Sequence, residues 1–144
     1  KAMLALGSRY GTGPVPIATL SKEEGIPIKF LELILLDLKG AGLLESKKGP
    51  RGGYLLSRPP STITVGTLIR TLEGPLAPLP CASENAYRPC DECHDVESCG
   101  TRIIMRQVRD AIAAVLDRTT LADAIRQSEM ARAKAKPEPL MYYI

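Results

Sequence analysis

The fold is decided by residues 25–57, which read GIPIKFLELILLDLKGAGLLESKKGPRGGYLLS. Pro27 suits the first position of a helix, where its missing N–H costs nothing, and Gly42 is typical of the residue that follows a helix end. We therefore predict a helix over residues 27–41. Apolar residues recur in it at the three-to-four spacing of a buried face, and these are Leu31, Ile34, Leu38 and Ala41.

A β-hairpin is predicted directly after this helix. Residues 43–47 and 54–57 are strand-like, and the turn between them, KGPRGG, contains three glycines and a proline, which suit a hairpin tip with positive φ angles. Before the helix, residues 15–24 form a short amphipathic segment that Gly25 stops, so two helices meet at the tight turn of a helix-turn-helix. A helix-turn-helix followed by a basic-tipped hairpin is the winged-helix arrangement. The alternative is a structural helical hairpin with an incidental β-ribbon.

A long helix is predicted over residues 101–118, beyond a shorter helix that Thr64 caps and a proline-rich stretch at 74–80. Its apolar residues follow the spacing of a coiled-coil seam in two adjacent stripes. One stripe can face the core and the other a partner, so we predict that this helix dimerises the protein. The alternative is a helix wholly buried in one subunit. The predicted dimerisation residues are Ile104, Met105, Val108, Ala111, Ile112 and Val115.

The predicted fold class is mainly α with a small β-hairpin wing, a winged helix-turn-helix domain plus a long dimerisation helix. Thr120 and Asp123 resemble a capping box that opens a last helix. Lys1 stands in mid-helix without an initiator methionine, so we expect further residues upstream. The predicted segments are a winged helix-turn-helix domain (1–60), a connecting helix and linker (61–80), a cysteine loop (81–100), the dimerisation and C-terminal helices (101–134) and a tail (135–144) with an apolar end that docks elsewhere.

Composition and charge narrow the class of protein further. With 144 residues, 44% of them hydrophobic, the chain suits one small globular domain, or one with an appendage. No apolar run approaches the roughly 18 residues of a membrane span, and no secretory signal is present, so we predict a cytoplasmic protein without a membrane partner. Residues 1–60 hold nine Lys and Arg against five Asp and Glu, whereas residues 75–100 hold one against five. The basic first half suits a polyanion such as DNA, which would repel the acidic loop.

Four cysteines, the only ones in the chain, lie within nineteen residues in the pattern Cys81-x8-Cys90-x2-Cys93-x5-Cys99. In a reducing cytoplasm, clustered thiols more often bind metal or sense redox state than cross-link a fold. Four thiolates satisfy a tetrahedral zinc or an iron–sulfur cluster, and a Cys-x2-Cys pair also serves as a redox dithiol. From the residues alone, a cluster, zinc, a disulfide switch and inert thiols all stay open. His94 is the only histidine, and we expect it at the surface rather than on a metal.

Together these segments resemble the IscR/NsrR/CymR family of bacterial winged-helix regulators, also called the Rrf-two family. The resemblance covers about residues 1–130 and implies a homodimer that binds a roughly palindromic operator, with many members holding an iron–sulfur cluster. It is carried by residues 25–35, 41–44, 48–56, 63–65 and 73–75, by Cys93-x5-Cys99 and by the long helix up to residues 120–123.

The resemblance also assigns roles to the cysteines. Cys93 and Cys99 match the second and third cluster ligands of the family, and either Cys81 or Cys90 suits the first. In many relatives the fourth ligand is a histidine three residues after the last cysteine. That position is Arg102 here, which cannot ligate, so we expect the fourth cysteine to complete the set.

DNA contacts are predicted on the helix 27–41, from Lys29, Phe30, Glu32 and Lys39. A lysine can contact phosphate or guanine, and a glutamate can accept a hydrogen bond from cytosine N4. The resemblance places base contacts at Lys29 and Glu32, and Phe30 belongs to the same matching motif. For each charged residue the alternative is a solvated surface side chain.

The wing tip supplies two further predicted DNA contacts, Lys48 and Arg51. Narrow minor grooves attract inserted cations. Lys48 stands where the family has its wing arginine, and Arg51 stands where a glycine is more common, so Arg51 is a candidate to supply the arginine instead.

The leading prediction is a homodimeric transcription regulator that binds double-stranded DNA and senses redox, iron, nitric oxide or sulfur status through a 2Fe-2S or 4Fe-4S cluster. Two alternatives in the same class stay open: a zinc or thiol switch, and a cluster-free regulator controlled by a protein or small molecule. From another class, a small iron–sulfur electron carrier would not need the basic hairpin. No Ser/His/Asp set, phosphate loop or pair of carboxylates indicates an enzyme.

Overall fold

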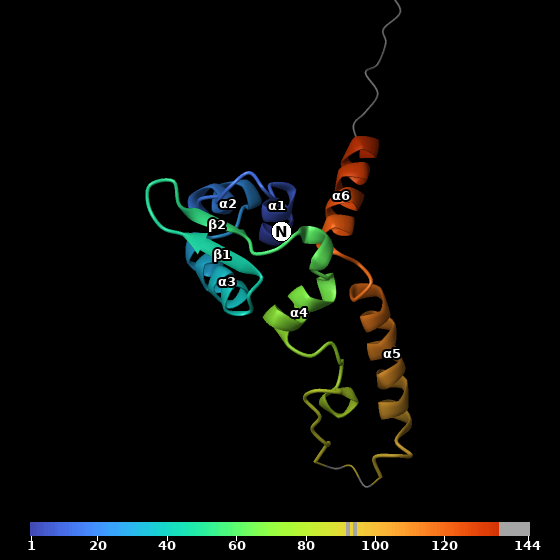
Figure 1. Cartoon of the computed structure of the whole chain (residues 1–144). Helices are drawn as coiled ribbons and strands as arrows, with labels where there is room; N and C mark the ends of the chain where they lie inside the picture. The colour runs from blue at the N-terminus through green and yellow to red at the C-terminus, as the bar shows by residue number, and fades with distance from the viewer. Residues whose placement is uncertain (92, 94, 136–144) are drawn as a thin grey trace, which may run out of the picture.

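The computed structural model describes residues 1–91, 93 and 95–135. The first three helices and the hairpin gather on one side of the molecule, α4 lies in the middle, and α5 and α6 lie on the other side (Figure 1). The predictions for His94 and for the tail beyond residue 135 lie outside the described residues. In chain order the elements are α1 (Ala2–Ser8), α2 (Ile17–Glu24), α3 (Ile28–Gly40), β1 (Leu44–Lys47), β2 (Gly53–Leu56), the 3-10 turn η1 (Pro60–Thr62), α4 (Val65–Glu73), the 3-10 turn η2 (Pro80–Ala82), α5 (Gly100–Leu116) and α6 (Leu121–Ala135).

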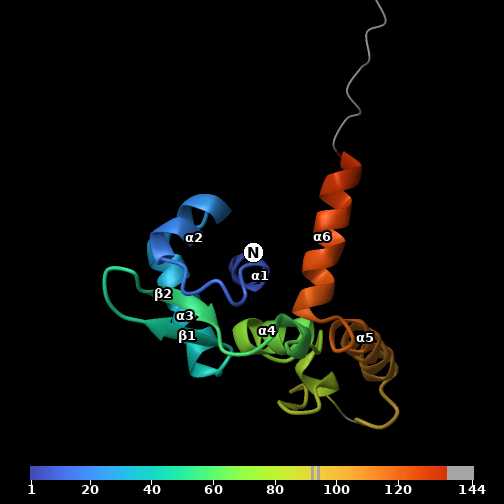
Figure 2. The ribbon, with the colours of Figure 1, turned by 45° about the horizontal axis from the view of Figure 1, so that its top comes forward.

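The helix-turn-helix and its wing form as predicted. Strand β1 pairs antiparallel with β2, with Leu44 opposite Leu56. Val15, just before α2, forms a single antiparallel β-bridge with Tyr54 of β2. Its N–H donates to the Tyr54 carbonyl at 2.8 Å, and its carbonyl accepts from the Tyr54 N–H at 2.9 Å. This bridge fixes the hairpin to the start of α2, so the wing projects from the body at a set angle (Figure 2). The predicted fold class, mainly α with a β-hairpin wing, is confirmed.

The buried face of α3 differs in part from the prediction. The side chains without solvent exposure are Leu31, Leu35 and Leu38, which recur at the four-then-three spacing of one helical stripe. Ile34 is only partly buried against this core. Ala41 is exposed, because α3 ends at Gly40 and Ala41 already lies in the turn. The buried stripe of α3 therefore passes through Leu35 rather than through Ile34.

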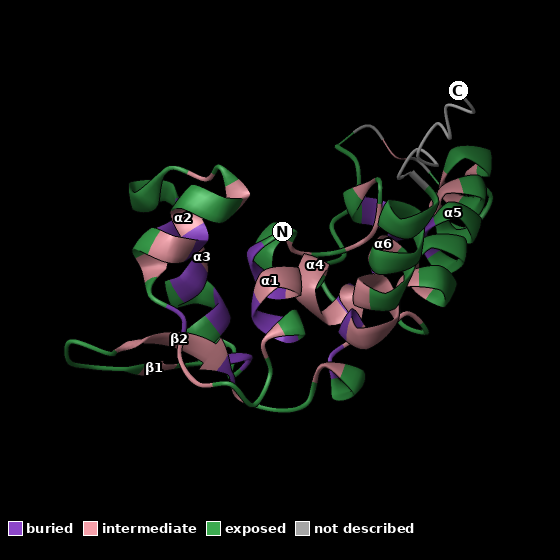
Figure 3. Ribbon diagram, turned by 90° about the horizontal axis from the view of Figure 1, so that it is seen from above, coloured by how far each residue is buried: buried purple, intermediate pink, exposed green. Residues whose placement is uncertain are grey.

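The N-terminal half and the long helix meet at one junction near α4. The Val65 N–H donates to the Thr119 carbonyl and the Leu121 N–H donates to the Ile63 carbonyl, both at 2.8 Å. Ile63 is fully buried and Leu121 is 1% exposed. The first residue of α6, Leu121, therefore belongs to the same core as the winged-helix half, and Figure 3 shows by colour which segments are buried.

The predicted helix starts at Thr64 and Thr120 are confirmed. The Thr64 hydroxyl accepts from the Thr67 N–H at 3.1 Å. The Asp123 carboxylate accepts from the Thr120 N–H at 3.0 Å, and the Asp123 N–H donates back to the Thr120 hydroxyl at 3.1 Å. Hydrogen bonding from Thr120 lowers the pKa of the Asp123 carboxyl. Within the described part of the chain, no helix is both long and apolar enough to cross a membrane.

Truncating the core of α3 tests this packing. We expect Leu35→Ala to lower the free energy of unfolding by about 2–5 kcal/mol, because it removes a fully buried side chain and leaves a cavity. The neighbouring Leu36 is 56% exposed, so Leu36→Ala is the matched control and should change stability by no more than about 0.5 kcal/mol. Urea denaturation measures both, and equal losses in the two variants would contradict the assignment of the buried face.

Candidate DNA interface and cysteine loop

The exposed side of α3 begins with three of the residues predicted to contact DNA. The Lys29 ammonium lies 3.2 Å from the Glu32 carboxylate, and 90% of the Lys29 side chain is exposed. Phe30 is 59% exposed. An exposed ion pair contributes little to stability, so both charges can exchange partners at low cost. The structure thus brings Lys29, Phe30 and Glu32 together at the N-terminal end of α3, the end with which a recognition helix approaches base edges.

Lys39 lies apart from these three residues. Its ammonium donates a 2.7 Å hydrogen bond to the hydroxyl of Ser46 in β1. The bond ties the C-terminal end of α3 to the hairpin. The geometry therefore separates Lys39 from the N-terminal group and gives it a structural contact that the sequence did not indicate.

The tip of the hairpin carries Lys48 and Arg51, both exposed. The tip is closed by a 2.9 Å hydrogen bond from the Gly52 N–H to the Gly49 carbonyl, and Gly49 has a φ of 105°, where a side chain would be strained. Figures 1, 2 and 3 all show the hairpin pointing away from α5. The two cations therefore stand at the end of the molecule opposite the long helix.

The four cysteines are free thiols with unequal exposure. Cys81, in η2, is buried, Cys93 and Cys99 are partly buried, and Cys90 is exposed. The pKa of the Cys90 thiol is raised, chiefly by hydrogen bonding with Cys81 and by the charge of Cys81, with smaller contributions from Cys93 and Cys99. The raised pKa indicates that the Cys90 thiol interacts with the Cys81 thiol and, more weakly, with the other two. In the residues that the structure describes, no three His, Cys, Asp or Glu side chains are set close enough to hold a metal ion.

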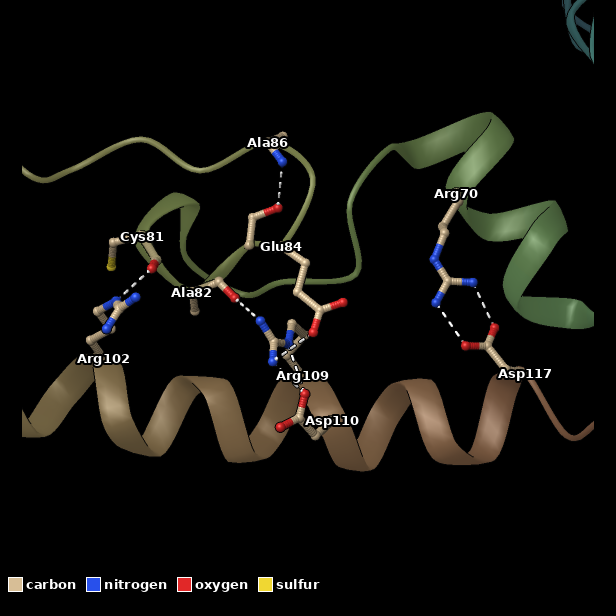
Figure 4. Close-up of polar contacts among 10 residues, drawn as sticks. Arg70, Cys81, Ala82, Glu84, Ala86, Arg102, Arg109, Asp110 and Asp117 are labelled. Carbon is tan, nitrogen blue, oxygen red and sulfur yellow. Dashed lines mark hydrogen bonds and ion pairs between the residues drawn. The ribbon is translucent and has the colours of Figure 1, made fainter. Parts of the chain in front are cut away.

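Arg102 of α5 holds the cysteine loop at two points, and Figure 4 shows the first of them, at Cys81. Its Nε donates to the Cys81 carbonyl at 2.9 Å, and Nη1 donates to the Val96 carbonyl at 3.5 Å. Its guanidinium also lies over the ring of Tyr87, 5.8 Å from the centroid. Arg102 thus joins the start and the end of the loop to the first turns of α5.

Arg109 makes a second attachment on the same face of α5, two helical turns further on (Figure 4). It is only 9% exposed, and its Nη1 donates to the Ala82 carbonyl at 2.6 Å. Its charge is balanced by Asp110 at 2.6 Å and Glu84 at 3.2 Å. Together Arg102 and Arg109 form what we call the arginine clamp. The clamp was not predicted from the sequence, although two arginines seven residues apart lie on one helical face and were the signal that could have indicated it.

A third arginine ties α4 to the end of α5. The Arg70 guanidinium binds the Asp117 carboxylate through two hydrogen bonds, at 2.6 and 2.8 Å, and this contact lowers the pKa of the Asp117 carboxyl. Arg70 and Asp117 flank Gly66 of α4, where a side chain would overlap the Asp117 carboxylate. Two planar groups paired in this way fix orientation as well as distance, so α4 and α5 are held in a defined register.

Most of the residues predicted to dimerise the protein face solvent on α5. Val115 is 64% exposed, Ile104 52%, Val108 38% and Ile112 36%. Ala111 is also exposed, and Met105 is partly buried. Ile103, 44% exposed, lies about a third of a turn away from this stripe and was not among the predicted residues. Several exposed apolar residues on one face of a helix are typical of an interaction site.

A helix-turn-helix with a basic wing, joined to a long helix with an exposed apolar face, defines the class of a winged-helix transcription regulator that binds DNA. The model of the Rrf2 family, described as iron-dependent transcriptional regulators, matches residues 1–127. The chain therefore belongs to the Rrf2 family, and the predicted family membership is confirmed. This family consists of regulators, not enzymes.

Individual relatives agree with this assignment. A protein from Rhodobacter capsulatus described as rrf2-like is 39% identical over 128 residues, covering 87% of this chain and 85% of the relative. The regulator CymR of Bacillus subtilis is 32% identical over 142 residues, covering 99% and 91%.

Solved structures give the same fold. The structure of CymR from B. subtilis, called the global cysteine regulator, matches with a TM-score of 0.71 at 31% identity, covering 87% of this chain and 88% of that one. T. potens IscR matches with a TM-score of 0.70 at 32% identity, covering 99% and 88%.

The interaction between the Cys81 and Cys90 thiols predicts that Cys90 is alkylated slowly. A raised pKa leaves less Cys90 thiolate at a given pH, and the thiolate is the reactive form. In the metal-free, reduced protein we expect Cys90 to be alkylated slowly at pH 8 and faster as the pH rises. The variant Cys81→Ala removes the largest cause and should speed alkylation at pH 8. Mass spectrometry of the Cys90 peptide measures the rates, with Ser83→Ala as the control, and an unchanged rate in Cys81→Ala would contradict the interaction.

Proposed function

We propose that this protein is a homodimeric regulator of the bacterial cytoplasm whose cysteine loop holds an iron–sulfur cluster, and that the state of this loop sets operator affinity. The arginine clamp carries the proposal. It fixes the backbone of Cys81 and Ala82 to α5, the helix whose other side exposes the apolar residues proposed to dimerise. A rearrangement of the loop therefore acts directly on the proposed dimer helix.

The donor types in the loop are those of a cluster, but the described residues do not bring three of them together, so loading would require the loop to rearrange. Four thiols within nineteen residues match the ligand type of iron–sulfur proteins. Arg102 is engaged by two backbone carbonyls, so the remaining ligand falls to the fourth cysteine. A bound cluster would supply an oxidisable centre, and its loss is the proposed signal. The iron-dependent description of the family and the similarity to IscR support a cluster over zinc.

The chain itself contributes the thiolates and their surroundings. In the metal-free protein, Cys81 raises the pKa of Cys90, so the two thiols do not readily become thiolates at the same time. A coordinating thiol must be deprotonated, which makes loading pH-dependent. We therefore expect loading to weaken as the pH falls.

The DNA contacts proposed are Lys29, Phe30 and Glu32 in the major groove and Lys48 and Arg51 in the minor groove. Two such sets, related by a two-fold axis, suit a palindromic operator. Coupling of about 1–3 kcal/mol between loop and DNA changes operator affinity by about 5–150-fold.

A thiol switch between Cys81 and Cys90 is the second candidate, favoured by the interaction between the two thiols that raises the pKa of Cys90. An organic hydroperoxide would oxidise the two thiols to a disulfide. Its O–O bond would break, and the hydroperoxide would be reduced to an alcohol and water. The buried Cys81 carries the clamped carbonyl, so a disulfide there would also pull on α5. The similarity to CymR is compatible with this candidate.

Anaerobic purification of the full chain tests the cluster. We expect a coloured protein with iron and acid-labile sulfide, and a change in operator affinity of about 5–150-fold when the cluster is removed. Cys93→Ser and Cys99→Ser should abolish the colour, because each removes a thiolate ligand, while Ser98→Ala is the matched control and should keep it.

Further arms of the same experiment separate the candidates. A colourless protein that binds zinc tightly, or one whose operator affinity changes only with peroxide and requires Cys90, would contradict the cluster and leave the regulator intact. Arg109→Met should keep the cluster but reduce the effect of its loss on DNA binding. An undiminished effect in that variant would contradict transmission through the clamp.

The proposed dimer is tested on α5 directly. Burying an unpaired carboxylate in an apolar interface costs several kcal/mol. We therefore expect the double variant Ile104→Glu, Val115→Glu to weaken dimerisation by at least about 100-fold, as measured by sedimentation equilibrium. Gln127→Glu places the same charge at an exposed site on α6 and should leave the dimer unchanged. A double variant that stays dimeric would contradict the assignment of this face.

A further inference from the structure

The exposed side of α3 is apolar at its centre. Leu33 is 63% exposed, Phe30 59% and Leu36 56%. With 3.6 residues per turn, Leu33 lies almost opposite the middle of the buried stripe formed by Leu31, Leu35 and Leu38. The part of α3 that projects furthest from the core is therefore a pair of leucines, bordered by Phe30.

These side chains are too many to be scattered surface hydrophobics. Three large apolar groups lie within seven residues on one helical face, which is the pattern of a binding surface. They share that face with Lys29, one turn before Leu33, whose ammonium is nearly fully exposed. A face that combines a cation with apolar groups suits a ligand that is anionic at its rim and has apolar groups within.

The major groove of DNA has these properties. Its rim is formed by phosphates, and the one apolar group that its base edges present is the C5-methyl group of thymine. The helix α3 is the proposed groove-reading helix of a transcription regulator, and Figures 1 and 2 show it at the same end of the molecule as the wing, away from α5. Continuity with the DNA interface therefore selects DNA as the occupant of this face.

We propose that Leu33 and Leu36 determine operator specificity by packing against thymine methyl groups. Leu33 lies four residues, or about 6 Å, beyond Lys29 along the helix axis. Base pairs are stacked about 3.4 Å apart, so the thymine read by Leu33 lies within about two base pairs of the position that Lys29 contacts. This inference rests on the proposed use of α3 as the groove-reading helix.

The test removes the methyl group and nothing else. An operator is first selected in vitro with the full chain, and each thymine of the half-site is then replaced by deoxyuridine, which keeps the base pair intact. For wild-type protein we expect one or two positions at which uridine weakens binding by about fourfold, the factor predicted by burial of one methyl-sized group. Leu33→Ala should bind the thymine and uridine operators equally at the position that Leu33 reads, and Leu36→Ala should do so at the position that Leu36 reads.

A matched variant separates methyl reading from general affinity. Lys29→Ala should weaken binding to both operators by the same factor and reduce the salt dependence, while the thymine preference stays. Leu33→Gln provides a second variant at the exposed site, should Leu33→Ala disturb the fold.

Each contrary result has a distinct meaning. Equal binding of thymine and uridine operators by the wild type would overturn the inference and leave the regulator in place. Absence of DNA binding in every state would overturn the proposed function itself. Unchanged thymine preference in Leu33→Ala, together with an altered oligomeric state, would assign the leucines to a protein contact instead.

Discussion

The proposed switch depends on the contacts of the buried Arg109 guanidinium with the cysteine loop. A cation with only 9% exposure must be paired, because an isolated buried charge is very costly. Asp110 and Glu84 balance its charge, and the Ala82 carbonyl accepts a hydrogen bond from its Nη1. Since α5 and the cysteine loop both contribute partners, neither can shift without disturbing the other. The arginine clamp thus gives a loop that buries little of itself a fixed place on a helix.

The same helix is joined to the DNA-binding half by the backbone. Hydrogen bonds link the strand-like residues around Thr64 to those around Thr120, and Leu121 enters the main core. Arg70 and Asp117 hold α4 against the end of α5. Because α3 packs against α4, a displacement of α5 would also act on α3 through α4. This route is a property of contacts far apart in sequence.

Local sequence signals predicted what local physics controls. The caps at Thr64 and Thr120 and the glycine-rich hairpin tip each act within a few residues and are found where expected. Pro27 was predicted at the first helical position, but it lies at the N-cap because α3 begins at Ile28. The buried face of α3 was only partly predicted, because Ile34 and Leu35 are equally apolar and only the neighbours of the helix choose between them. The arginine clamp was missed because charged side chains on a helix usually point to solvent.

The order of elements, the wing, the cysteine spacing and the family can be read from the chain alone, since they follow from backbone preferences and residue patterns. The interaction of the Cys90 and Cys81 thiols, the binding of the cysteine loop by Arg102 and Arg109, and the exposure of leucines on the outer side of α3 emerge only in the folded protein. The physical reason is that each of these depends on packing between segments, or on the burial that such packing leaves, and spacing along one segment does not specify it.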